Sequence, residues 1–508
     1  MDEFDKDTAS KALFKSQPVD KDLKRIGQLQ RATHEAGRNI YNLGFGLLFL
    51  LGVWLFAYLK SDGDGSLILI AAAVIGGYMA MNIGANDVAN NVGPAVGSKA
   101  LTMVGALLIA GIFEALGAIV AGGEVVSTIS KGIVSPESIA DADTFIWAMM
   151  AALMSAALWV NLATWIGAPV STTHSIVGGV MGAGIAAAGF GAVDWPVMGA
   201  IAASWVISPV LGGLVAAMFL TFIKVTVLFK ADKISAAKRW VPILVAIMAT
   251  AFSAYLMVKG LKRIWKPDMA LIAAVSVSIA FLTYFWVRGR VERASKTMEN
   301  KRKSVSKLFT VPLICSAALL SFAHGSNDVA NAVGPLAAIV NAVNDGMVST
   351  KTSLPFWVLV IGALGISVGL ILFGPKIIRL VGEKITKLDH IRAFCVALSA
   401  AITVIFASGM GLPVSSTHIA VGAVFGVGFV REAITNRGGG IPERVTADDG
   451  AAAVIDEGKL FKSWRKHRKR KLVRRQYVLS IAAAWVVTVP ASALLSAALY
   501  FGIQFVRH

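Results

Sequence analysis

The chain has 508 residues, of which 56% are hydrophobic and only 15% charged, and its formal net charge is +18. A soluble globular protein carries more charge and shorter apolar runs, so this composition excludes that class. The basic residues lie mainly between the apolar runs, which is typical of cytoplasmic loops and speaks against nucleic acid as a partner.

Apolar runs long enough to cross a bilayer recur along the whole chain. A membrane-spanning helix needs roughly 20 predominantly apolar residues. Such runs lie at 43–59, 67–83, 101–122, 144–166, 196–223, 241–258, 269–287, 307–323, 355–374, 391–409 and 477–503. Two shorter glycine-rich runs, at 175–190 and 417–430, predict short helices or the arms of broken ones. We therefore expect an all-α polytopic membrane protein with about 12 core spans plus one extra N-terminal span at 40–60.

The charges of the loops predict which ends of the spans face the cytoplasm. Segments 1–39, 288–307 and 459–475 are basic and indicate the inner side, whereas 61–66 and 135–144 contain no basic residue and indicate the outer side. The 459–475 run is expected to be a solvated loop, with contact to anionic membrane lipid as the alternative. One basic loop does not fit, because alternation would put Lys259, Lys262, Arg263 and Lys266 outside.

Two halves of the chain repeat the same motifs in the same order. Gly-Ala-Asn-Asp-Val-Ala-Asn at 84–90 returns as Gly-Ser-Asn-Asp-Val-Ala-Asn at 325–331. Likewise, Pro-Val-Ser-Thr-Thr-His at 169–174 returns as Pro-Val-Ser-Ser-Thr-His at 413–418. Duplication in a membrane protein predicts two inverted-topology repeats with broken helices or hairpins and a site between them. The expected parts are a cytoplasmic tail (1–39), the extra span (40–60), a first repeat (66–228), connecting spans with a basic loop (229–306), and a second repeat (307–504) that carries a basic cytoplasmic insertion (431–475).

The duplicated Asn-Asp motif places charge where charge is costly. A carboxylate inside an apolar run usually has a functional role and a polar partner. Carboxamides can donate to an oxyanion or offer carbonyl oxygen to a cation. The candidate anion ligands are therefore Asn86, Asn90, Asn327 and Asn331. Asp87 and Asp328 are the candidate cation-coupling groups, and they would be the Na+ ligands if the coupling ion is Na+.

The hydroxyl runs read as helix starts, because a proline precedes them and an apolar glycine-rich run follows. A helix N-terminus with free N–H groups suits an anion, and simple helix capping is the alternative. This adds Ser171, Thr172, Thr173, Ser415, Ser416 and Thr417 to the candidate anion ligands. No lysine or arginine occurs near either motif, so an oxyanion beside two carboxylates would be repelled unless cations enter with it. This favours cation-coupled symport.

Three further polar residues leave alternatives open. His174 and His418 follow the hydroxyl runs, and either proton transfer or hydrogen bonding in the first helical turn would explain them. Glu114 lies within a span, and its counterpart in the second half is Gly362. It is either a coupling carboxylate or the partner of a polar neighbour.

These motifs resemble the inorganic phosphate transporter (PiT) family, whose two halves share a Gly-x-Asn-Asp-x-Ala-Asn signature. The resemblance covers nearly all of 66–504 and implies a sodium- or proton-coupled symporter of inorganic phosphate that works by alternating access, typically as a homodimer. It implies no enzyme and no cofactor besides the transported ion, and it assigns the binding site to the asparagines, aspartates and hydroxyls named above. The N-terminal tail, the added span and the basic insertion depart from a minimal member.

Three other functions remain as alternatives. They are a sulfate permease of the same family, a passive channel, and an intramembrane hydrolase that pairs Ser171 with His174 or Ser415 with His418. We expect an integral protein of a bacterial inner (plasma) membrane.

Overall fold

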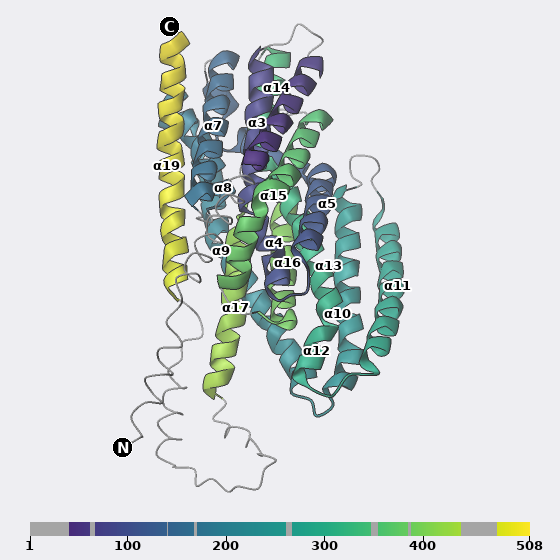
Figure 1. Ribbon diagram of the computed structural model, residues 1–508. Helices are drawn as coiled ribbons and strands as arrows, with labels where there is room; N and C mark the ends of the chain where they lie inside the picture. Colours follow the sequence, from purple (N-terminus) through teal and green to yellow (C-terminus); the bar gives the residue numbers. More distant parts are fainter. Residues whose placement is uncertain are drawn as a thin grey trace, which may run out of the picture.

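Helices make up the part of the chain that the computed structural model describes (Figure 1). The described residues are 40–60, 67–139, 141–166, 170–260, 267–346, 354–384, 388–437 and 475–507. Within them the only β-pairing is a single bridge between Val134 and Val193. The predictions for the tail 1–39 and for most of the basic insertion, 438–474, lie outside the described residues.

An N-terminal helix, Ile40–Lys60, precedes the labelled ones. The main helices are α3 (Leu67–Asn86), α4 (Ala89–Gly97), α5 (Met103–Ala121), α6 (Gly123–Ser127), α7 (Ala142–Ile166), α8 (Thr172–Ala188), α9 (Trp195–Ile223), α10 (Lys233–Tyr255), α11 (Met269–Ser295), α12 (Arg302–Leu308), α13 (Thr310–Asp328), α14 (Ala330–Asp345), α15 (Phe356–Lys384), α16 (His390–Gly409), α17 (Ser416–Arg437) and α19 (Arg475–Arg507). A π-helical turn, η4 (Lys224–Leu228), extends α9, and another, η5 (Leu256–Gly260), extends α10.

The all-α membrane fold is confirmed. Among the described residues, 11 helices are long and apolar enough to cross a membrane, or up to 12 if the bent pair Arg302–Leu308 and Thr310–Asp345 is one span. The expected total of thirteen is higher because it counted the 175–190 run, which belongs to α8. With 17 residues, α8 is a short helix rather than a full span.

The N-terminal helix packs on the outside of the bundle. Asn42 donates a hydrogen bond to the carbonyl of Leu372 on α15, and Phe56 meets Trp357 edge to face. Only 17% of its most apolar window is buried, so most of its apolar surface is left for lipid.

Corresponding helices of the two halves make corresponding contacts. α3 packs on α15 while its counterpart α13 packs on α5, and α8 packs on α19 while its counterpart α17 packs on α9. Each half therefore completes the other. In Figure 1, α4 continues below α3, whereas α14 continues above α13, so the two motif-bearing pairs run in opposite directions.

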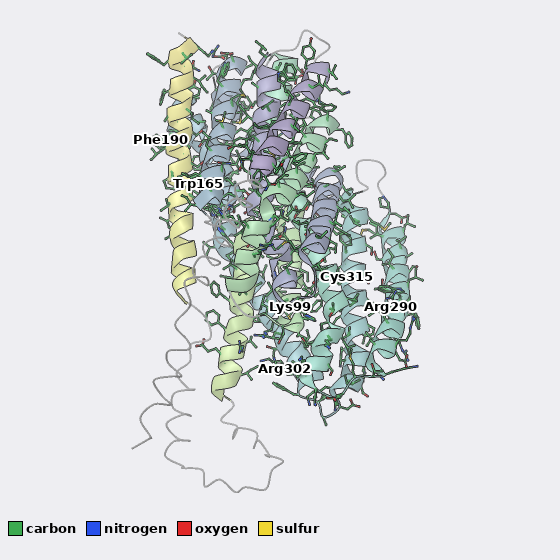
Figure 2. All side chains as sticks on the ribbon, viewed as in Figure 1. Lys99, Trp165, Phe190, Arg290, Arg302 and Cys315 are labelled. Atoms are coloured by element: carbon green, nitrogen blue, oxygen red, sulfur yellow. The ribbon has the colours of Figure 1, made fainter. Side chains whose placement is uncertain are left out.

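Charged contacts join loops at each end of the bundle. Arg507, at the end of α19, lies 2.7 Å from Asp143 at the start of α7, and Asp143 belongs to the 135–144 segment that loop charge assigned to the outer side. At the other end of the bundle, Arg302 of α12 lies 3.4 Å from Asp389, which precedes α16. Figure 2 shows Arg302 at that lower end.

Lys259 belongs to the basic loop that did not fit the alternation of inner and outer loops, and its contacts explain its charge. Its ammonium lies 3.3 Å from the carboxylate of Glu124 and donates to the carbonyl of Gly409 at the end of α16. Its charge is thus used inside the protein, and the positive-inside tendency of free loops does not govern it. Lys262, Arg263 and Lys266 lie outside the described residues.

Candidate functional site

Both Asn-Asp motifs lie where a helix is briefly interrupted. Asp87 and Val88 separate α3 from α4, and Val329 alone separates α13 from α14. At the first break the N–H of Asn90 bonds to the carbonyl of Asp87, three residues back, which tightens the turn. The breaks expected at the motifs are therefore present but small, and the larger bend of 44° lies earlier, between Leu308 and Thr310.

The proline that follows each motif lies at a position where it changes the backbone hydrogen bonding of the second asparagine. Pro94 and Pro335 lie inside α4 and α14, four residues after Asn90 and Asn331. Proline has no N–H, so each asparagine carbonyl loses its usual helical donor. The motif thereby supplies a backbone oxygen beside the side-chain oxygens.

Hydroxyl groups from both repeats converge on the two carboxylates. Thr172, the first residue of α8, donates to Asp87 at 2.6 Å and lies 3.2 Å from Asp328. Thr417, in the first turn of α17, donates to Asp87 at 3.0 Å. The single hydroxyl hydrogen of Thr172 is therefore shared between two buried carboxylates, those of Asp87 and Asp328.

The serines at the same helix starts have a different role. Ser171 accepts the N–H of His174 at 3.1 Å, and Ser415 accepts that of His418 at 3.3 Å, so both are helix caps. Ser416 is buried and its hydroxyl has no hydrogen-bond partner among the described residues.

The second asparagine of each motif reaches the hydroxyls of the other repeat. Asn90 donates to Thr417 at 2.8 Å. Asn331 donates to both Thr172 and Thr173, each at 3.2 Å. The structure therefore brings each Asn-Asp motif against the hydroxyl run of the opposite half.

The first asparagine of each motif contacts its own repeat. Asn86 donates to Thr164 of α7 at 2.8 Å, and Asn327 donates to Ser408 of α16 at the same distance. Asn327 also donates to the carbonyl of Leu412 at 3.2 Å. These bonds orient the side-chain oxygens of the asparagines.

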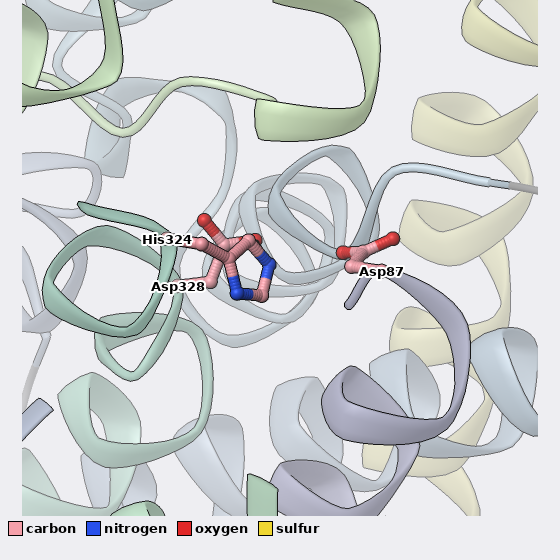
Figure 3. Close-up of side chains that lie close together, drawn as sticks. All are labelled: Asp87, His324 and Asp328. Carbon is pink, nitrogen blue, oxygen red and sulfur yellow. The ribbon is translucent and has the colours of Figure 1, made fainter. Parts of the chain in front are cut away.

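Asp87, His324 and Asp328 form a buried cluster at the centre of these contacts. One ligand atom from each lies within 4.8 Å of the other two. Figure 3 shows His324 and Asp328 side by side on α13, with Asp87 opposite them at the end of α3. Among the described residues, the side chains that hydrogen-bond or ion-pair with the two aspartates are threonines and this histidine.

Oxygen atoms without a donor surround this cluster. Asp328 Oδ1, Asn327 Oδ1 and Asn331 Oδ1 are buried and have no hydrogen-bond partner in the described part of the chain. Unpaired buried oxygens are costly, and carboxylate and carbonyl oxygens are the ligands that hard cations prefer. The arrangement can therefore hold a small cation.

Glu114 joins the cluster through His324. Its carboxylate lies 2.6 Å from His324 Nδ1 and accepts a hydrogen bond from Asn91 at 2.7 Å. His324 Nε2 in turn lies 3.3 Å from Asp328. Glu114 thus has polar partners, as one of its two interpretations expected, and these partners connect it to the second motif.

Helix packing shows which residue of the second half is equivalent to Glu114, and it is not the expected Gly362. A Cβ on Gly325 would collide with the Glu114 carbonyl oxygen, and a Cβ on Gly84 would collide with that of Ile366. The position equivalent to Glu114 is therefore Ile366, one helical turn after Gly362. The counterpart expected from the sequence, Gly362, is thus one helical turn out of register, which keeps the same helix face.

The two histidines that follow the hydroxyl runs meet beside the cluster. Their ring centroids lie 4.7 Å apart, and His174 stacks on Trp205 at 3.8 Å. His174 Nδ1 lies 2.6 Å from Ser171 Oγ. This is hydrogen bonding in the first helical turn.

His324 is the residue that sequence reasoning missed. It lies inside an apolar run, one turn before Asp328, and the first motif has Ile83 at the matching position. That departure between two otherwise matching motifs was the available signal, because a titratable side chain within a span is itself a functional candidate.

Comparisons with known proteins find similarity to phosphate transporters. The model of the phosphate transporter family matches residues 83–496. A Helicobacter pylori (strain J99) protein named "Putative phosphate permease" is 48% identical, over 96% of this chain and 99% of its own. A "Putative phosphate permease" of Pyrococcus abyssi is 34% identical, over 85% of this chain and 97% of its own. A solved structure titled "The sodium-dependent phosphate transporter" is 35% identical, with a TM-score of 0.74 over 87% of this chain and 100% of that one.

Proposed function

This chain belongs to the phosphate transporter family, and we propose that it moves inorganic phosphate across a membrane in symport with a cation. It is a transporter of the membrane and not an enzyme, which removes the hydrolase alternative. Consistent with this, the Ser171 hydroxyl is buried and caps α8.

One observation carries the coupling proposal. Two buried aspartates from opposite repeats lie close together, and no lysine or arginine in the described part of the chain pairs with them. Two carboxylates at such a distance repel one another and repel an arriving oxyanion. A cation that binds between them lowers both costs, so anion and cation would bind together.

The candidate ligands fall into two groups by their chemistry, one for the cation and one for the anion. Asp87 and Asp328, with the oxygens of Asn327 and Asn331, suit Na+ because hard cations prefer oxygen ligands. The N-terminal turns of α8 and α17, with the Ser416 hydroxyl, suit the phosphate. The Thr173 hydroxyl donates to the Val414 carbonyl at 3.1 Å, so it would have to turn to reach the anion. Sodium is favoured over protons as the coupling ion because the similar solved structure is titled as sodium-dependent.

Phosphate is favoured over sulfate by a hydrogen-bond argument. At neutral pH phosphate keeps an O–H that can donate to a carboxylate, whereas sulfate has none. Asp328 Oδ1 is buried without a donor among the described residues, and a carboxylate oxygen has two lone pairs, so it can bind Na+ through one and accept the phosphate O–H through the other.

The architecture supports alternating access. The two motif-bearing helix pairs run in opposite directions and each half completes the other, which supports inverted repeats that rock around a fixed central site. A homodimer and a location in the bacterial inner membrane stay predictions.

The test is uptake of labelled phosphate into proteoliposomes under separately imposed Na+ and pH gradients. We expect an inward Na+ gradient to drive accumulation that excess sulfate does not reduce. Complete competition by sulfate would refute the phosphate assignment. Accumulation driven only by the pH gradient would replace Na+ with H+, and flux that persists without either gradient would indicate a channel.

A further inference from the structure

The segment that joins α16 to α17 runs from the surface of the protein to the candidate site. We call residues 409–414 the tip segment. Met410 is 62% exposed, whereas Ser415, which caps α17, is only 3% exposed. α17 then begins at the candidate ligand Ser416. The course of the tip segment therefore decides where the N-terminal turn of α17 lies, and this turn contacts Asp87.

The carbonyl groups of the tip segment are held by side chains from five other elements. Carbonyls at a helix end and in a loop have no helical donor, so they need other partners. The bonds run to Gly409 from Lys259 in η5 (3.1 Å), to Gly411 from Thr128 in η1 (Thr128–Gly132; 2.8 Å), to Leu412 from Asn327 in α13 (3.2 Å), to Pro413 from Trp205 in α9 (3.3 Å) and to Val414 from Thr173 in α8 (3.1 Å). Such a set of donors fixes the path of the segment.

Lys259 is the one charged donor among these five, and it binds the exposed end of the tip segment. Its ammonium also lies 3.3 Å from the Glu124 carboxylate, and the two side chains are 21% and 32% exposed. Gly411, two residues after Gly409, has a φ of +72°, a left-handed turn that glycine adopts without strain. Its donor Thr128 lies one turn after Glu124. α6, η1 and η5 therefore hold this turn from one side.

We propose that Lys259, held by Glu124, is a positioning residue for the anion site, an inference that rests on the phosphate transport proposed above. A lysine on a flexible stem stays in one place only when a partner holds it, and the Glu124 carboxylate is such a partner. The bond from Lys259 to Gly409 then fixes the exposed end of the tip segment, while Trp205 and Thr173 fix its buried end. Without Lys259 the exposed end can move, and the N–H groups at the start of α17 move with it.

The ion pair suits this role better than it suits stabilisation of the fold. Ion pairs at partly exposed positions contribute little to stability, because solvent screens them. The bond from the ammonium to Gly409 is different, since a carbonyl at the end of a helix has no donor within the helix. The role also accounts for a lysine in a loop that alternation places outside.

The kinetic test compares Lys259→Met with Lys259→Arg and with the matched control Lys301→Met, in the full-length protein in proteoliposomes. Methionine keeps the stem and removes the charge with its donors, whereas arginine keeps both. Lys301 also forms an ion pair, at 2.6 Å from Glu299, but this partner lies two residues before it in the chain. Initial rates of sodium-driven uptake over a range of phosphate concentrations give KM and kcat separately, and melting temperatures report on the fold.

We expect Lys259→Met to raise the KM for phosphate about tenfold, which corresponds to the loss of one charged hydrogen bond, with kcat and melting temperature nearly unchanged. Lys259→Arg should recover most of the affinity, Glu124→Gln should be intermediate, and Lys301→Met should match the unchanged protein. An unchanged KM in Lys259→Met would overturn the proposal. A rise in KM accompanied by a fall in melting temperature would also overturn it, since the lysine would then serve the fold.

A second measurement does not depend on the substrate. The exposed Met410 becomes a labelling site as Met410→Cys, in a background with Cys315→Ala and Cys395→Ala. A nitroxide at this position should be more mobile in Lys259→Met than in the unchanged chain, and Lys259→Arg should restore the restriction. Equal mobility in all three would overturn the proposal. If the unchanged protein takes up no phosphate, the proposed function fails, and the nitroxide still decides whether Lys259 positions the tip segment.

Discussion

Thr172 should be the most sensitive hydroxyl of the site, because within the described part of the chain it is the only one that contacts both carboxylates. Thr172→Val is nearly isosteric, so it removes the hydroxyl and leaves no cavity. The variant loses a donor to Asp87 at 2.6 Å, a contact to Asp328 at 3.2 Å and an acceptor for Asn331. A hydrogen bond to a charged group contributes about 1.5–3 kcal/mol, so we expect about ten- to hundredfold less phosphate uptake.

The comparison variants separate this effect from general damage. Thr172→Ser keeps the hydroxyl and should retain most of the activity. Thr417→Val removes one donor to Asp87, at 3.0 Å, and should cost less than Thr172→Val. Thr403→Val is the matched control, because the buried Thr403 hydroxyl donates only to the Ser399 carbonyl of its own helix.

Initial rates of labelled phosphate uptake in proteoliposomes, with melting temperatures in detergent, give the measurement. The reasoning is refuted if Thr172→Val transports at the unchanged rate, or if Thr403→Val loses as much activity as Thr172→Val. A fall in melting temperature that parallels the fall in uptake would also contradict it, since the hydroxyl would then serve the fold.

Three further predictions concern charge and close packing. Asp87→Asn and Asp328→Asn should each abolish gradient-driven uptake at an unchanged melting temperature, because an amide keeps the shape and loses the charge; retained uptake in either variant would contradict its coupling role. Gly325→Ala should lower both melting temperature and uptake, since its Cβ would collide with a backbone oxygen of α5, whereas Gly199→Ala has open space around it and should leave both unchanged. Burial alone would raise the pKa of Asp389, but the hydrogen bond and charge of its arginine neighbours hold the pKa of that carboxyl below its ordinary value. Asp389 therefore stabilises the fold above about pH 4 and loses this effect as the pH falls through its lowered pKa, so the melting difference from an Asp389→Asn variant should shrink in acid; a difference independent of pH would refute the ion pair.

The helices could be predicted well because the apolar runs are long. Each run of about 20 residues became a helix, since a chain in hydrocarbon must satisfy its backbone hydrogen bonds within the segment. Hydropathy could not decide how far α8 extends, because an apolar run that starts at the centre of the bundle looks like one that starts at its surface. It also could not show the size of the bend after Leu308, although Pro312, four residues further on, removes the helical donor to the Leu308 carbonyl.

The motifs identified which residues gather at the centre, and the structure assigned their partners. The six hydroxyls looked alike in the sequence, yet Ser171 and Ser415 cap helices while Thr172 and Thr417 bond to a carboxylate. Capping depends on which residue ends the extended segment, and sequence alone places that boundary only within a residue or two. Partners from opposite repeats, such as Asn90 and Thr417, lie far apart in the chain, so no local pattern could pair them.

The balance of charges at the centre explains why Glu114 and His324, which occur in only one half each, matter. The central group contains three carboxylates, on Asp87, Asp328 and Glu114, and one histidine, His324. Even with His324 protonated, two negative charges remain before any phosphate arrives. Neutrality then requires either protons on the carboxyl groups or cations between them, and these are the two coupling ions that separate gradients distinguish. Glu114 and His324 have no titratable counterparts in the other half, and His324 lies 3.3 Å from Asp328, whereas its ring nitrogen is only within 4.8 Å of Asp87, so the two aspartates have unequal surroundings. The two aspartates of a duplicated motif are therefore expected to take up their cations with unequal affinity, which gives an order to binding that symmetric repeats alone would not have.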